Sequence, residues 1–139
     1  MIEVDILERF VNKDIDAKLV NPLALAFVGD TVYDLFVREE LVCTNKSNVG
    51  RLHSLAVQKV KAKAQSDGAK KVLPILTDEE KDIFMRCRNA HSGHIAKNAS
   101  VEDYHYATAL EGVFGFLYLK SDLQRLRELV EIINSEDKK

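Results

Sequence analysis

Apolar residues recur every three or four positions through most of this chain, which is the spacing of one face of an α-helix. Only two prolines and six glycines interrupt the 139 residues, and the alternating β-branched runs that favour strands are mostly absent. The sequence therefore predicts an all-α fold. With 46% hydrophobic residues the chain can bury one core but is too short for two ordinary domains, so we expect a single domain over residues 1–139.

Capping signals set the boundaries of the expected helices. Asn21 followed by Pro22 predicts an N-cap and a first-turn proline for a long helix. Thr77, followed by three acidic residues, predicts another helix start. The stretch 89–100 is small and polar, which is typical of a loop between helices. The expected helices cover approximately residues 3–11, 21–42, 49–66, 69–76, 77–88, 102–119 and 121–133.

The net charge of −2 conceals an uneven distribution. Residues 46–97 carry 11 Lys and Arg against 5 Asp and Glu, whereas the rest of the chain carries 9 against 17. A basic middle section permits binding to phosphate, but ordinary solvated helix faces have the same balance. Charge alone therefore leaves nucleic-acid binding open.

The sequence contains no signal for a membrane and no firm one for a transition metal. No apolar run approaches the length of a membrane span, and the N-terminus is acidic where a signal peptide is basic, so we expect a cytoplasmic protein. Cys43 and Cys87 have no zinc-ligand spacing and are expected to be reduced. His91 and His94 lie three residues apart, and together with His105 they could suggest a transition-metal site. The loop that holds His91 and His94 has no carboxylate or cysteine, so solvent or RNA contact is the preferred interpretation.

Two acidic residues interrupt the apolar faces of two expected core helices. Asp30 shares a stripe with Ala26 and Tyr33, and Glu111 shares one with Ala107 and Phe114. We expect both carboxylates to be buried, which is costly unless the charge is compensated. The compensation could be a structural bridge to Lys or Arg, or a shared divalent cation. Glycines beside both acids favour a site, although plain helix packing would also use them.

Two motifs resemble the ribonuclease III domain. Residues 25–34, LAFVGDTVYD, resemble its signature helix, and residues 109–119, ALEGVFGFLYL, resemble its other catalytic helix. The order of further elements, NPLALA at 21–26, LH at 52–53, AKAQ at 62–65 and RCRNA at 86–90 before KN at 97–98, is similar to mini-ribonuclease III. That family lacks a separate double-stranded-RNA-binding domain, which agrees with a chain ending at Lys139.

The resemblance implies a magnesium-dependent endonuclease that cuts double-stranded RNA. Asp30 and Glu111 would be the catalytic residues and the Mg²⁺ ligands. Larger ribonuclease III enzymes carry further acids where this chain has Leu23, Ala26 and Thr108, so Asp34 is an additional candidate metal ligand. The resemblance also implies a homodimer that leaves 5′ phosphates and short 3′ overhangs, and a precursor of large-subunit ribosomal RNA as substrate.

Without an accessory module, the domain itself must grip the RNA backbone, because an A-form duplex is recognised mostly by shape. The candidate RNA-binding residues are Lys59, Lys63, Arg86, Arg88, Asn89, Lys97 and Asn98. Structural ion pairs are an equally good explanation for several of these cations. Two other functions also stay open, a catalytically inactive RNA-binding or ribosome-assembly module and a plain helical interaction protein.

Overall fold

The structure of the protein is a computed structural model that describes residues 9–11, 13–90 and 100–135. The described residues form helices and connecting segments without a strand, which confirms the all-α prediction. Two short 3-10 helices are present, η1 (Ala17–Leu19) and η2 (Leu73–Ile75). The α-helices are α1 (Pro22–Thr44), α2 (Val49–Val60), α3 (Ala62–Val72), α4 (Asp78–Arg88), α5 (Val101–Leu119) and α6 (Leu123–Asn134).

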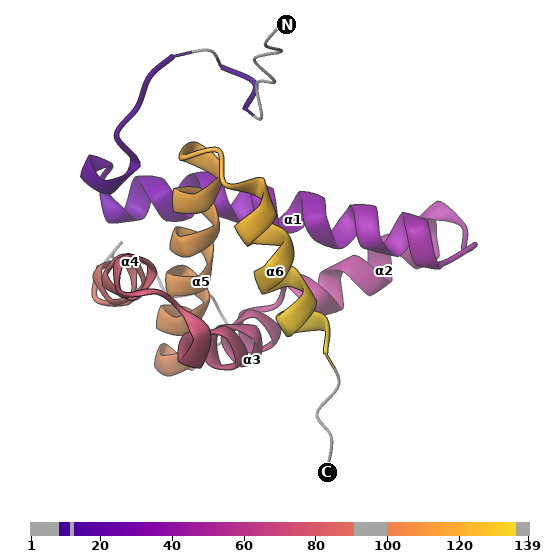
Figure 1. Ribbon diagram of the computed structural model, residues 1–139. Helices are drawn as coiled ribbons and strands as arrows, with labels where there is room; N and C mark the ends of the chain where they lie inside the picture. The colour runs from indigo at the N-terminus through magenta and orange to yellow at the C-terminus, as the bar shows by residue number, and fades with distance from the viewer. Residues whose placement is uncertain (1–8, 12, 91–99, 136–139) are drawn as a thin grey trace, which may run out of the picture.

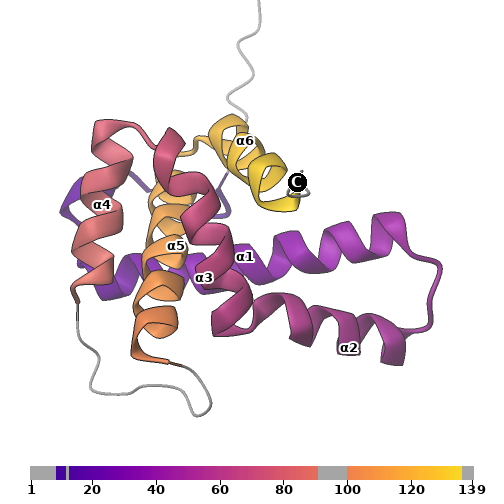
Figure 2. The same cartoon turned by 90° about the horizontal axis from the view of Figure 1, so that it is seen from below.

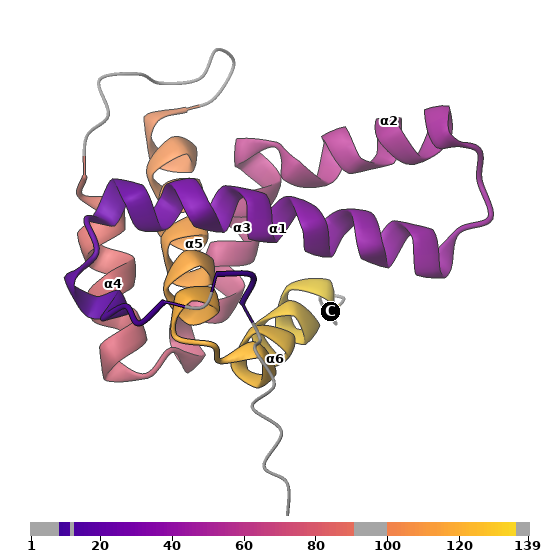
Figure 3. The ribbon, with the colours of Figure 1, turned by 90° about the horizontal axis from the view of Figure 1, so that it is seen from above.

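Helix α5 is the centre of the fold, with α1, α3, α4 and α6 around it (Figure 1). Every residue from Ala107 to Leu117 is buried except Glu111. A helix that is apolar on all sides is stable only inside a core. Figures 2 and 3 show that α1 continues past α5 and forms a hairpin with α2, which projects from the other helices. No described helix has the length and apolarity needed to cross a membrane.

The capping predictions at Asn21 and at Thr77 are confirmed, and a third helix has a side-chain cap as well. The Asn21 side chain accepts a hydrogen bond from the backbone N–H of Leu23 at 2.9 Å. Thr77 and Glu80 form the reciprocal capping box of α4. Asp122 caps α6, while the preceding Ser121 has a φ of 63° and lies outside the helix. These side chains satisfy backbone donors that a helix end leaves unpaired.

The prediction of one helix over residues 49–66 is wrong. Lys61 has an extended backbone, with ψ of 149°, which ends α2 and starts α3 in a new direction. Asp67 and Gly68, expected to interrupt a helix, lie inside α3. A Cβ at Gly68 would meet the side chain of Ile133 in α6 at 3.4 Å, an ordinary contact distance, so the packing does not require glycine here.

The two remaining helix predictions fare differently. Residues 69–72 continue α3, and the segment then tightens into η2 at Pro74 rather than forming a separate α-helix. Most of the expected helix at 3–11 lies outside the described residues, and residues 9–11 form a bend. Proline at the start of η2 cannot donate the backbone hydrogen bond that would extend α3.

A buried ion pair joins α4 to α6. Two nitrogens of Arg125 lie 2.9 Å from the two carboxylate oxygens of Glu80, whose side chain is 6% exposed. Arg125 also donates to the carbonyl of Ile75 at 2.8 Å. Burial works to raise the pKa of Glu80, but hydrogen bonds from Arg125 and Thr77 outweigh it and hold that pKa below its usual value. The pair therefore fixes the side of the core opposite the α1–α2 hairpin without leaving a free charge.

Candidate active site

The backbones of α1 and α5 touch at two glycines. A Cβ at Gly29 would lie 1.6 Å from the carbonyl oxygen of Glu111, and a Cβ at Gly115 would lie 2.0 Å from that of Leu25. No side chain fits at either position, so the contact requires glycine on both helices. It also fixes Asp30, which follows Gly29, beside Glu111.

Asp30 and Glu111 form a carboxyl pair in which the two side chains are hydrogen-bonded. Glu111 is partly buried, as its position on α5 predicts, but the expectation that Asp30 is buried is wrong. The buried stripe of α1 follows Leu25, Gly29, Tyr33 and Val37, and Asp30 lies one position around the helix from it. The pair therefore opens to solvent on the side of Asp30.

The environment of Glu111 favours its protonated form. Burial, followed by the charge of Asp30 and the hydrogen bond with it, raises the pKa of Glu111 to about 8, against an opposing contribution from Gln65. Tyr33 lies near the same charge, and its pKa is raised to about 12 by burial, Glu40 and Glu111. Two neighbouring carboxylates repel each other unless they share a proton or a cation.

The donor set fits Mg²⁺. This ion is commonly bound through one or two protein carboxylates, with water and substrate phosphate completing its coordination. Within the part of the chain that the structure describes, no group of three or more acidic, histidine or cysteine side chains could hold a metal. Asp34, the additional candidate, accepts a hydrogen bond from Arg38 at 3.1 Å. Among the described residues, the protein ligands available for a metal ion at Asp30 are therefore the carboxylates of Asp30 and Glu111.

Gln65 is a site residue that sequence reasoning did not single out. It is 3% exposed, and its side-chain amide lies near Glu111, where it acts to lower the pKa of that carboxyl. The sequence places it in the AKAQ element, but a continuous helix over residues 49–66 gives no reason for it to face α5. Thr108, one turn before Glu111, does not face the pair as a ligand, because its hydroxyl donates to the carbonyl of Tyr104 at 3.0 Å.

The candidate RNA-binding cations that the structure describes have different partners. Lys59 pairs with Glu40 at 2.8 Å and Lys63 with Asp67 at 3.1 Å, both near the surface. Such exposed pairs are weak, so these lysines can exchange their partners for phosphate. Arg86 differs, since its guanidinium donates to the carbonyl of Lys18 at 3.0 Å and thereby ties α4 to η1.

The end of α4 places two further candidates together. Arg88 donates to the side chain of Asn89 at 3.2 Å and lies 5.4 Å from the ring centroid of Tyr106. Both residues line a pocket of about 540 Å³ together with the first turns of α5. Lys97 and Asn98 lie outside the described residues, as do His91 and His94.

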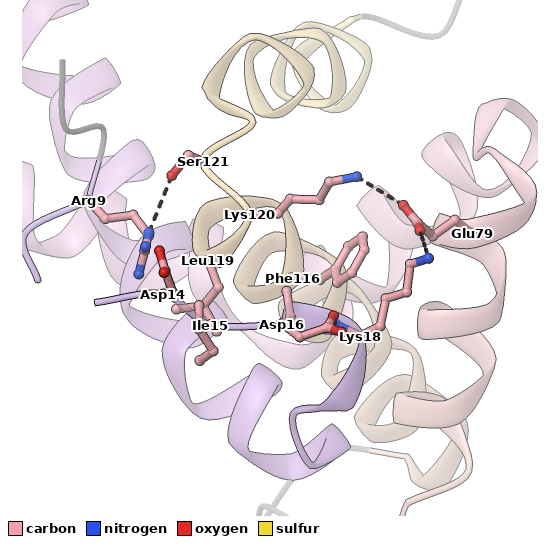
Figure 4. A pocket seen from close by; sticks show the side chains of 11 residues that line it. Arg9, Asp14, Ile15, Asp16, Lys18, Glu79, Phe116, Leu119, Lys120 and Ser121 are labelled. Carbon is pink, nitrogen blue, oxygen red and sulfur yellow. Dashed lines mark hydrogen bonds and ion pairs between the residues drawn. The ribbon is translucent and has the colours of Figure 1, made fainter. Parts of the chain in front are cut away.

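A larger pocket lies at the other end of α5 and does not include the carboxyl pair. It has a volume of about 640 Å³ and is bordered by Phe116, Leu119 and the segment before α1. Figure 4 shows Lys18 and Lys120 both reaching Glu79, each at 2.9 Å. Those hydrogen bonds lower the pKa of Glu79. The balanced charges give this pocket no preference for an anion or a cation.

Comparisons with known proteins agree on one family. Residues 23–122 match the Ribonuclease III domain. The chain is 42% identical over 127 residues to a Mini-ribonuclease 3 of Clostridium tetani, covering 91% of this chain and 83% of the relative. It is also 42% identical over 123 residues to the Mini-ribonuclease 3 of Staphylococcus aureus, covering 87% and 92%. A crystal structure of a Fusobacterium nucleatum protein superposes with a TM-score of 0.76 at 31% identity, over 82% of this chain and 93% of that one.

Proposed function

Because this chain belongs to the mini-ribonuclease III family and is an endoribonuclease, we propose double-stranded RNA as its substrate and Asp30 and Glu111 as its catalytic carboxylates. The family resemblance seen in the sequence motifs is confirmed by these matches. The observation that carries the proposal is the carboxyl pair itself, which the glycine contact between α1 and α5 holds together. Residues 1–139 are proposed to act as one catalytic domain.

We propose Mg²⁺ as the cofactor, held by Asp30 and Glu111. When bound, the ion would activate water and stabilise the charge on the phosphate. The protein's contribution is to hold two hard oxygen donors at the surface of a rigid core, where a charged substrate can reach them. Asp34 would contribute only after leaving Arg38, so we assign it no more than a supporting part.

The RNA would be held by its backbone. Lys59, Lys63, Arg88 and Asn89 supply exposed or partly exposed groups for phosphates and 2′-hydroxyls. We extend the same role to Lys97, Asn98 and Arg86, the last of which already supports η1. When Lys and Arg side chains neutralise several phosphates, the affinity for RNA falls steeply as the salt concentration rises. A plain helical interaction protein would not show this salt dependence.

We propose a homodimer that uses the outer face of α1. Phe27 is 78% exposed, Leu35 is 59% exposed and Val42 is 65% exposed, an unusual series of apolar side chains on one helix. Phe27 lies about one turn before Asp30, so a second copy packed on this face would bring two carboxyl pairs into one assembly. Two such pairs could cut both strands, leaving 5′ phosphates and short 3′ overhangs.

For the biological substrate we propose a precursor of large-subunit ribosomal RNA, cut in the cytoplasm. The support is the likeness to mini-ribonuclease III seen in the sequence. The main competing function is an inactive relative that binds RNA or assists ribosome assembly. Presence of both Asp30 and Glu111 in contact favours the enzyme.

The test is cleavage of a long duplex RNA by the wild type, Asp30→Asn and Glu111→Gln, each with Mg²⁺ and with EDTA. Binding of the same duplex is measured separately by filter titration. We expect cutting only by the wild type with Mg²⁺, and binding by all three. Glu39→Gln, which removes the charge of an exposed acid on α1, is the matched control and should retain most activity. A wild type that binds without cutting would favour the inactive module.

A further inference from the structure

Gln65 is a buried amide in contact with the carboxyl pair. Its side chain is 3% exposed and lies where α3 packs against α5, near the Glu111 carboxyl. Burying an amide is unfavourable unless its polar atoms find partners, and the Glu111 carboxyl is an acceptor within its reach. Glu111 consequently lies between Asp30 on α1 and Gln65 on α3.

The break between α2 and α3 directs Gln65 to this position. Lys61 ends α2 with an extended backbone, and its carbonyl then accepts the backbone N–H of Gln65 at 2.9 Å, in the first turn of α3. Figure 2 shows α3 leaving the hairpin at this point and lying alongside α5. The change of helix direction therefore places Gln65 against Glu111.

The Gln65 amide can orient the Glu111 carboxylate but cannot neutralise its charge. A glutamine N–H donates to a carboxylate but adds no charge. A lysine or arginine at this place would pair with Glu111 and compete with a cation, as Arg125 does when it occupies both oxygens of Glu80. Gln65 leaves the negative charge of the pair available while it restricts the Glu111 side chain.

We propose that Gln65 is a positioning residue, whose amide holds the Glu111 carboxylate in the orientation at which it meets Asp30. This inference rests on the proposed function of Glu111 and adds a residue outside the carboxylate pair. Residues that orient a metal ligand through a hydrogen bond change metal affinity or activity by about 10- to 100-fold when removed. They do so without touching the substrate.

The test compares the wild type with Gln65→Met, which keeps an unbranched side chain of similar length but removes the amide. Ser66→Ala is the matched control, because Ser66 is the next buried polar residue on α3. Mn²⁺ binding without RNA is followed by the electron paramagnetic resonance signal of the free ion, and kcat and KM are measured on duplex RNA with Mg²⁺. We expect Gln65→Met to bind Mn²⁺ and to turn over about tenfold less well, with KM unchanged, and Ser66→Ala to resemble the wild type.

A crystal structure of Gln65→Met separates this inference from the proposed function. We expect Glu111 to change rotamer or to occupy several rotamers in the variant. If Glu111 keeps its wild-type orientation, or if kcat and Mn²⁺ affinity are unchanged, Gln65 does not position it. If the wild type neither binds Mn²⁺ nor cuts RNA, the nuclease proposal fails, while the rotamer comparison still decides the role of Gln65.

Discussion

Replacing Glu111 with glutamine should stabilise the folded protein at alkaline pH, although we propose that the same change abolishes cleavage. The pKa of Glu111 is raised from 4.5 to about 8 by burial and by Asp30. A raised carboxyl pKa means that stability is fully present below about pH 4.5 and is lost as the pH rises through about 8. Glutamine keeps the shape of the side chain and removes the charge, so Glu111→Gln escapes this loss.

The size of the effect follows from the pKa difference. Each unit is worth about 1.4 kcal/mol, so the full shift sets an upper bound of about 5 kcal/mol. Because Asp30 is exposed and water screens the pair, we expect about 1–3 kcal/mol at pH 8.5. For a chain of this length that corresponds to a Tm increase of roughly 3–12 °C.

The assay is thermal unfolding by circular dichroism in EDTA, from pH 4 to pH 9, for the wild type and Glu111→Gln. Taking the difference between the two proteins at each pH cancels the other titrating groups. Glu102→Gln is the matched control on α5, since Glu102 forms an exposed pair with Lys70. Its Tm difference should stay small at every pH. If the Glu111→Gln difference is absent at pH 8.5, or equally large at pH 4, then the pKa of Glu111 is not raised and the reasoning fails.

Three further substitutions test the packing and the assembly. Gly29→Ala should lower the free energy of unfolding, measured in urea, by about 3 kcal/mol or more, because the added Cβ forces α1 away from Glu111. Gly50→Ala is the control: its Cβ would meet only an ordinary contact at 3.4 Å, so the variant should be as stable as the wild type or slightly more stable. Arg125→Met should cost about 3–5 kcal/mol in the same assay, since it leaves a buried carboxylate unpaired; a loss below 1 kcal/mol would contradict that account. Phe27→Glu should yield monomers in sedimentation velocity at concentrations where the wild type and Val57→Glu are dimeric; an unchanged dimer would place the interface elsewhere.

The sequence predicts the helices that carry the site because their signals are local. Asn21 with Pro22, and Thr77 with Glu80, act within one turn, so their positions in the chain determine the start of α1 and α4. The apolar character of α5 likewise predicts its burial without knowledge of its neighbours. The predicted bounds of α1, α4, α5 and α6 agree with the structure within two residues.

The site could be predicted only in part because its geometry is set between helices. Periodicity places Asp30 on an apolar stripe of α1. Because α1 packs against α5 through Gly29, the buried face of α1 is centred on Gly29, and Asp30 lies beside that face and is exposed to solvent. Lys61 carries no proline or glycine signal, yet it separates α2 from α3 and brings Gln65 to Glu111. Neither feature can be read from helix propensity, because tertiary packing overrides local preference.

Glu80 and Glu111 are both removed from full solvent exposure, yet their pKa values move in opposite directions. Arg125 keeps Glu80 ionised, so its contribution to stability is present above about pH 4.5 and is lost as the pH falls through its lowered pKa. Glu111 has another carboxylate and an uncharged amide as its neighbours, so its contribution is lost in the other direction, as the pH rises. Among the described residues, the fold places a cation against the first glutamate, and a carboxyl group and an amide against the second. That difference identifies Glu80 as structural and supports Glu111 as the residue that meets a metal ion.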